Sequence, residues 1–219
     1  MKINKISTYE FKEYNALGIQ SEINFSKKDN LEVILHEELG EPIEDQDIQL
    51  INEFQPLLFS VDIDSTELLE NEVLNIDCLT LLDGHHRYDF ISRNNIDSSI
   101  KVIIVSSSAV NIDSHLSEIK IEKSKFVEFI ESQNFLYNSN SKYYIKIGDD
   151  IYSSNKIIDI YELYDFKRQC FQNGFISPLA NDRELTNKNI VSFTPIKLNE
   201  FYKENYLFPP KSTWITPRI

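Results

Sequence analysis

The sequence is poor in the residues that cross-link small proteins or bind structural metals. Its 219 residues include two cysteines, four histidines and five glycines. Cys78 and Cys170 lie far apart and form no CxxC pair, which argues against a zinc ribbon or a disulfide scaffold and fits a reducing, cytoplasmic setting. The N-terminus has no apolar signal run, and no stretch approaches the roughly 20 apolar residues that a membrane helix needs. We therefore expect no membrane partner.

Positive charge is also scarce. The chain has 22 Lys and Arg against 35 Asp and Glu, a formal net charge of −13, and no run of Lys and Arg exceeds two residues. This balance repels phosphate backbones at long range and disfavours a nucleic-acid-coating protein, although it still allows a local basic pocket. With 41% hydrophobic and 12% aromatic residues, the chain can bury a substantial core.

The hydrophobic pattern predicts an α+β chain. In residues 1–112 we expect strands at 31–35, 57–63, 78–82 and 101–105 and helices at 44–54 and 86–93. In residues 113–219 we expect helices at 122–133, 157–172 and 199–205 and a hairpin at 143–152. The change of texture near residue 112 divides the sequence into a mixed core and a second α+β half.

Two of the four histidines and one glycine fall in Asp83-Gly84-His85-His86-Arg87. This loop between a predicted strand and a predicted helix presents backbone N–H groups, two imidazoles and a guanidinium at one point, which is the chemistry of a phosphate site. Arg87 offers a bidentate fork, and Asp83 could hold Mg²⁺ or orient a ligand hydroxyl. In the alternative reading, Asp83 caps the helix, Gly84 makes the turn and the histidines lie at the surface.

Residues 81–88, Leu-Leu-Asp-Gly-His-His-Arg-Tyr, resemble the signature box of proteins with the ParB/sulfiredoxin fold. Within that fold, the Asp-Gly-His form is most similar to the free-serine kinases and to a related bacterial family of unknown function. The resemblance implies a ParB/sulfiredoxin-like core in residues 1–112. It also implies a nucleotide partner, ATP or ADP, with Mg²⁺. Gly84, His85, His86 and Arg87 would bind phosphate, and Asp83 would act in catalysis and bind the metal.

Two further elements match the same families. His36-Glu37-Glu38 follows a predicted strand, and the resemblance implies that Glu37 is the base on the substrate hydroxyl, with Glu38 as a competitor and His36 near the substrate. Near the C-terminus, Pro209-Pro210-Lys211-Ser212-Thr213 resembles a Pro-Pro-Lys-Ser-Thr ending, in which Lys211, Ser212 and Thr213 would form a second phosphate clamp. Without the resemblance, these elements read as a solvated loop and a stiff extended tail.

The sequence departs from the archaeal-type serine kinases directly after the clamp, where Trp214-Ile215 stand in place of Arg-His. This departure leaves the identity of the acceptor substrate open. Ser114-His115 could match a Thr-His element of the unknown-function family, but a lone histidine in a polar loop is more often without a role, and we leave it outside the predicted site.

We therefore expect a kinase that transfers phosphate from a nucleotide to the hydroxyl of a small metabolite, with free L-serine as the first candidate. One alternative is a non-catalytic nucleotide or phosphate-ligand binding protein of the same fold. A ParB-like nucleic-acid-binding module is disfavoured by the net charge and by the lack of a basic recognition helix. A sulfiredoxin-like reductase needs a cysteine in the loop, where this chain has His85.

Overall fold

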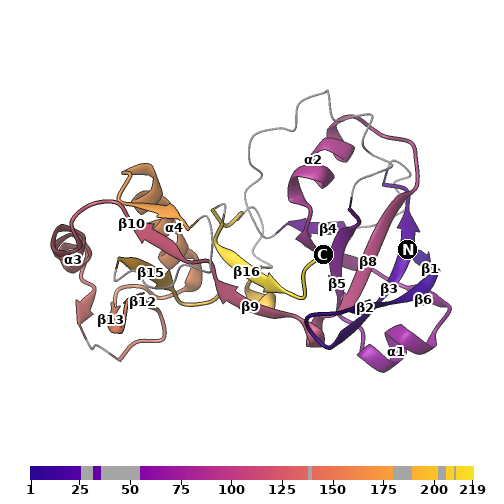
Figure 1. The fold of residues 1–219 in the computed structure, drawn as a ribbon, viewed down its shortest axis with the longest axis horizontal. Coiled ribbons are helices and arrows are strands. Elements are labelled where there is room, and N and C mark those ends of the chain that lie inside the picture. Colours follow the sequence, from indigo (N-terminus) through magenta and orange to yellow (C-terminus); the bar gives the residue numbers. More distant parts are fainter. Residues whose placement is uncertain (26–31, 36–54, 138–139, 180–188, 202–205, 210) are drawn as a thin grey trace. The chain divides into compact units, whose positions relative to one another are not determined.

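The computed structural model describes the chain except residues 26–31, 36–54, 138–139, 180–188, 202–205 and 210 (Figure 1). The fold is α+β, as predicted, and it forms two compact units. The first comprises Met1–Asn111, Phe201–Leu207 and Ile215–Ile219, and the second comprises Ile112–Glu200 and Phe208–Trp214. The helix predicted at 44–54 lies outside the described residues. No helix in the described part of the chain is long and apolar enough to cross a membrane.

The first unit is built on a six-stranded mixed sheet with the order β2-β3-β8-β5-β7-β4. Its strands are β2 (Ser7–Phe11), β3 (Ala16–Ile23), β8 (Ile100–Ser106), β5 (Leu57–Val61), β7 (Cys78–Asp83) and β4 (Glu32–Leu35). The β4–β7 and β5–β8 pairs are parallel, and the other pairs are antiparallel. The four strands predicted in this half are confirmed as β4, β5, β7 and β8.

The middle of this sheet is buried on both faces. Every residue of β5 is buried, as are the last five residues of β8. This is why both strands read as continuous apolar runs rather than as alternating patterns. The main core cluster includes Ile19, Leu57, Phe59, Leu79, Leu81, Val102 and Ile104. β7 lies between β5 and β4 in this packed sheet, so the packing fixes the position of its last residue, Asp83.

Among the described residues of the first unit there are two helices, α1 and α2, which are drawn in Figure 1. Helix α1 (Ser65–Glu70) begins at Asp64, whose side chain accepts a hydrogen bond of 2.8 Å from the Thr66 amide. A single residue, Gly84, separates β7 from helix α2 (His85–Arg93), which confirms the helix predicted at 86–93. The unit also has a short ribbon of β1 (Lys2–Asn4) and β6 (Val73–Asn75) and a 3₁₀ turn, η2 (Ser107–Ala109).

The second unit has its own six-stranded sheet with the order β11-β13-β12-β15-β10-β14. Its strands are β11 (Leu136–Tyr137), β13 (Asp150–Ser153), β12 (Tyr144–Ile147), β15 (Ile190–Phe193), β10 (Ser117–Ile119) and β14 (Ile176–Pro178). All of the pairs are antiparallel. The predicted hairpin is confirmed as β12–β13, and its turn uses Gly148 at a φ of 62°. A further short pair joins β9 (Asn111–Ser114) and β16 (Thr213–Thr216).

Helices α3 (Lys123–Ser132) and α4 (Ile160–Gln172) confirm the two longer helices predicted in this half. Asp159 caps α4 by accepting a hydrogen bond of 2.8 Å from the Glu162 amide. The helix ends at Asn173-Gly174, where Gly174 has a φ of 68°. The helix predicted at 199–205 is observed as a 3₁₀ turn, η3 (Leu198–Phe201), before residues outside the described part.

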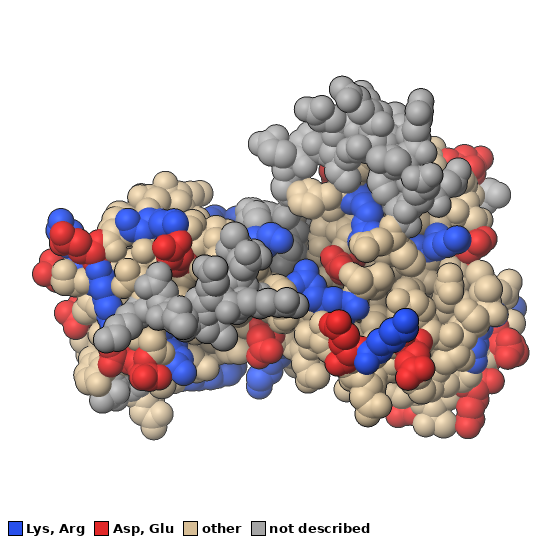
Figure 2. Space-filling model, in the orientation of Figure 1, with Lys and Arg blue, Asp and Glu red and all other residues tan. Residues whose placement is uncertain are grey.

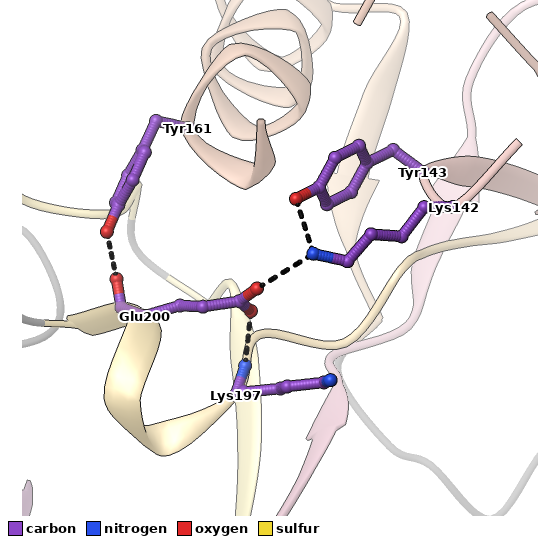
Figure 3. A network of polar contacts seen from close by, with 5 residues as sticks. All are labelled: Lys142, Tyr143, Tyr161, Lys197 and Glu200. Atoms are coloured by element: carbon purple, nitrogen blue, oxygen red, sulfur yellow. Dashed lines mark hydrogen bonds and ion pairs between the residues drawn. The ribbon is translucent and has the colours of Figure 1, made fainter. Parts of the chain in front are cut away.

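Glu200 of η3 connects three parts of the second unit (Figure 3). One carboxylate oxygen accepts a hydrogen bond of 2.8 Å from the Lys197 amide, and the other lies 3.6 Å from Nζ of Lys142. The Glu200 carbonyl accepts a hydrogen bond of 2.5 Å from the hydroxyl of Tyr161 in α4. The Lys142 ammonium donates to the hydroxyl of Tyr143, which is the main reason that its pKa is raised. The network fixes η3 against the start of α4.

Candidate functional site

The connection between β7 and α2 follows an irregularity in the pairing of β7 with β5. Leu58 pairs with Asp83 and the next residue, Phe59, pairs with Leu81, so Leu82 is an extra residue in β7. A β-bulge of this kind changes the direction in which the following side chains point. It therefore sets the direction in which Asp83 and the helix leave the sheet.

Gly84 begins helix α2 in a left-handed conformation, with φ 93° and ψ 25°. It provides no side-chain cap, and no acidic residue occupies the first turn of the helix. The carboxylate of Asp83 accepts a hydrogen bond of 2.9 Å from the Gly84 amide rather than from an amide within the helix. The first turn thus has the backbone N–H groups and the positive dipole end that favour an anion. This geometry disfavours the reading in which Asp83 is merely the helix cap.

The guanidinium of Arg87 folds back over Gly84. A Cβ placed on Gly84 would lie 2.9 Å from Nη2 and 3.1 Å from Nε of Arg87. Nη1 of Arg87 donates a hydrogen bond of 2.5 Å to the carbonyl of Gln55. Partial burial lowers the pKa of Arg87, and the nearby Asp83 carboxylate opposes that shift. The positive charge therefore lies at the entrance of the helix, in a fixed position.

The two histidines of the loop differ in exposure. His85 is partly buried and His86 is exposed. Tyr88 closes the first turn, because its amide donates a hydrogen bond of 2.8 Å to the Gly84 carbonyl. Its ring contacts that of Phe25 edge to face at 5.6 Å between centroids, and burial raises the pKa of its hydroxyl. Residues 83–87 thus lie where β7 ends and helix α2 begins.

His36, Glu37 and Glu38 lie outside the described residues. The strand that precedes them is described: β4 runs parallel to β7, and its last residue, Leu35, pairs with Leu81. Since parallel strands end at the same edge of a sheet, the chain leaves β4 at the edge where β7 ends in Asp83.

The segment that resembles the C-terminal clamp belongs to the second unit, except Pro210, which is not described. Lys211 is exposed and has a positive φ of 55°. Ser212 is fully buried, and its hydroxyl donates a hydrogen bond of 2.5 Å to the Pro209 carbonyl. Thr213, which opens β16, is also buried. Of these three side chains, that of Lys211 is the one exposed to solvent.

The described residues contain no cluster of three or more His, Cys, Asp and Glu side chains that could hold a metal ion. Mg²⁺ in nucleotide sites is commonly held by one or two carboxylates together with phosphate oxygens. Asp83 is a partly buried carboxylate beside the helix start, so it fits that more limited requirement.

Sequence reasoning missed a buried lysine in the second unit. Lys167 has no exposed surface, and its ammonium donates to the carbonyls of His115, Lys211 and Ser212 at 3.3–3.4 Å. It also lies 5.2–5.8 Å from the ring centroids of Tyr164, Phe171 and Phe193. A signal was present, because residue 167 occupies the apolar stripe of α4. His115, which we left outside the site, is one of its partners and is itself buried.

Acidic and basic side chains are mixed on the described surface. On the face drawn in Figure 2, acidic side chains stand beside basic ones over the described residues of each unit. Exposed ion pairs of this kind include Lys120–Glu118 and Lys125–Glu122. Such mixed charge is typical of a solvated surface rather than of a nucleic-acid footprint.

No protein-family model matches the chain, and no curated protein matches it. Among solved structures, it is similar to C-terminally truncated SbnI from Staphylococcus aureus, with a TM-score of 0.55 and 11% identity over 91% of this chain and 84% of that one. It is also similar to a conserved hypothetical protein from Pyrococcus furiosus, with a TM-score of 0.50 and 15% identity over 92% of each chain. A free serine kinase mutant in complex with ADP gives a TM-score of 0.48 and 14% identity over 90% of this chain and 87% of that one. The first two likenesses show a shared fold.

Proposed function

We propose that this protein is a nucleotide-dependent kinase with a ParB/sulfiredoxin-like core, which phosphorylates the hydroxyl of a small metabolite. Free L-serine is the first candidate acceptor. One observation carries the proposal: helix α2 begins at a left-handed glycine with no side-chain cap, and Arg87 folds over that start. This arrangement suits a phosphate group, and it falls on the residues that resemble the kinase signature box.

The loop has the parts that phosphoryl transfer requires. Such catalysis consists mostly of positioning and of neutralising charge on the phosphoryl oxygens. In our proposal, the phosphates are bound by the backbone amides of the first turn of α2. The side chains of His85, His86 and Arg87 also bind them. A bidentate guanidinium contact adds direction as well as charge. Asp83 lies at the helix start, where it would hold Mg²⁺ against the phosphate oxygens. The metal would neutralise charge that develops during transfer.

Glu37 is the proposed base. The parallel pairing of β4 with β7 supports this role, because β4 ends at the sheet edge that carries Asp83. A carboxylate there would accept the proton of the acceptor hydroxyl as the oxygen attacks phosphorus. His36 would contact the acceptor. In the second unit, Lys211, Ser212 and Thr213 would bind phosphate. For the buried Ser212, the clamp would act through the backbone, since its hydroxyl already donates to Pro209.

The proposal is tested by isothermal titration of the full chain with ADP and with ATP in the presence of Mg²⁺. We expect one of the two to bind. Phosphate transfer from the nucleotide that binds is then screened against free amino acids and small alcohols. Failure of both nucleotides to bind a folded protein would refute the proposal.

The exchange Glu37→Gln separates an enzyme from a non-catalytic nucleotide-binding protein. A kinase with Glu37 as base should keep nucleotide affinity and lose about 10²–10⁴-fold in turnover. Glu38→Gln is the matched control and should retain activity. If neither the wild type nor the variants transfer phosphate while all of them bind nucleotide, the protein is a sensor rather than a kinase.

A further inference from the structure

The second unit contains a pocket of about 440 Å³, within the size range typical of small-molecule sites. Its floor lies on the antiparallel sheet. Tyr144 and Lys146 are two residues apart in β12 and so share one face, and Lys146 pairs with Ser192 of β15. The intervening Ile145 is fully buried and belongs to the opposite face.

Two aromatic rings form a wall of the pocket. The rings of His115 and Trp214 lie 5.9 Å apart between centroids, tilted by 58°. Nδ1 of His115 lies 2.9 Å from the carbonyl of Leu116, which can only accept, so Nδ1 carries the proton. Trp214 is partly exposed. With Tyr144, the pocket thus offers three flat rings to a ligand.

This wall is held in place by the buried ammonium of Lys167. Its three carbonyl partners belong to His115, Lys211 and Ser212, which lie in the two segments that carry the rings. The His115 amide also donates a hydrogen bond of 3.1 Å to the Ser212 carbonyl. A pocket whose walls are fixed before the ligand arrives loses less conformational entropy on binding.

The polar groups around the rings are few and of mixed character. Asp113, Ser114 and Ser192 supply hydrogen-bonding oxygens, and Lys146 supplies a positive charge. A largely apolar lining with a few polar groups is typical of a site for a flat heterocycle. The oxygens can accept from ring N–H and amino groups, and the aromatic rings can stack on the ring face.

We propose that this pocket binds the purine base of the nucleotide, an inference that rests on the proposed nucleotide-binding function. Trp214 directly follows Thr213 in β16, and Lys211 lies three residues before Trp214. A chain rises at most about 3.3–3.6 Å per residue, so base and phosphate contacts on this segment lie within the span of one nucleotide. The segment that resembles a phosphate clamp would thus bind the phosphates of the nucleotide, and the ring of Trp214 that follows it would bind the base of the same molecule.

Trp214 provides the readout, because it is the single tryptophan of the chain. The full-length protein is titrated with ADP, adenosine and inorganic pyrophosphate while tryptophan fluorescence is recorded. We expect ADP and adenosine to change the emission, because each carries the base, and pyrophosphate to leave it unchanged. ADP binding by calorimetry with unchanged emission would overturn this inference and leave the proposed function standing. Absence of both ADP and ATP binding in calorimetry would overturn both.

A variant pair tests the same point without fluorescence. Trp214→Leu should weaken ADP binding about tenfold or more, as loss of base stacking does elsewhere, and should leave pyrophosphate affinity unchanged. Trp214→Phe keeps a flat ring and should recover most of the ADP affinity. Tyr137→Leu removes an exposed ring of the same unit outside the pocket and serves as control. Equal losses for ADP and pyrophosphate in Trp214→Leu would contradict a base-binding role.

Discussion

The guanidinium of Arg87 occupies the space in which a side chain at position 84 would begin. A Cβ on Gly84 would lie 2.9 Å from Nη2 of Arg87 and 2.6 Å from Cδ2 of Leu57. The glycine is therefore required both for its positive φ and for the close approach of the charge to the helix start. The backbone conformation at Gly84 and the position of the Arg87 guanidinium therefore depend on each other.

The first prediction concerns Gly84→Ala. A non-glycine residue in the left-handed region costs about 1–2 kcal/mol, and the overlap with Arg87 and Leu57 adds roughly 1–3 kcal/mol. Gly148→Ala is the matched control, because Gly148 also has a positive φ but nothing lies within 4 Å of its Cβ position. Urea unfolding of both variants should give a larger loss of unfolding free energy at position 84. Equal losses would show that the loop is not closely packed.

The second prediction concerns the buried Lys167. Lys167→Met keeps an unbranched side chain but leaves three carbonyl acceptors without this donor, which should lower the free energy of unfolding by about 1–3 kcal/mol. Lys125→Met, on the exposed face of α3, should change it by less than about 0.5 kcal/mol. Chemical denaturation measures both. A Lys167→Met protein as stable as the wild type would show that the ammonium does not hold the two segments.

Cys170 supplies a prediction about pH. Burial raises the pKa of its thiol to about 12, although the nearby Lys167 opposes the shift. A thiol in the unfolded chain has a pKa of about 8.5, so the folded protein retains the proton that the unfolded chain loses. This contribution to stability is fully present below about pH 8.5 and is lost as the pH rises toward 12.

The check compares the wild type with Cys170→Ala in urea unfolding between pH 7 and pH 10. The stability of the wild type relative to the variant should fall as the pH rises. A thiol reagent at pH 8 should modify the partly exposed Cys78 first and Cys170 only on unfolding. A stability difference that does not depend on pH, or rapid modification of Cys170 in the native state, would contradict its burial.

Much of the first unit was predictable because its strands are apolar runs bounded by polar residues. β4, β5, β7 and β8 follow from that pattern, and α2 from the glycine that precedes it. The long β3, by contrast, was missed. It contains Gly18 and the buried polar Ser21, so its sequence does not alternate cleanly. Gly18 allows a close approach, because a Cβ there would lie 2.7 Å from the carbonyl oxygen of Ile104.

The candidate site was predictable only where its residues are contiguous in sequence. Residues 83–87 are consecutive in the sequence, so a single motif identifies them. The pocket in the second unit joins residues far apart in the chain, such as His115, Tyr144 and Trp214, and no local pattern reveals that they meet. Lys167 was missed, because charged residues are rarely buried without an acidic partner.

The most direct test of the proposed function is ADP binding, in the presence of Mg²⁺, by two variants of helix α2. Arg87→Gln removes the guanidinium that lies over Gly84. Arg93→Gln removes the same charge from the last turn of the helix, where Arg93 pairs with Asp89. With folding verified by circular dichroism, isothermal titration should show about tenfold or greater weakening for Arg87→Gln and little change for Arg93→Gln. Equal affinities of the two variants, or no ADP and no ATP binding by the wild type, would contradict the phosphate site at residues 83–87.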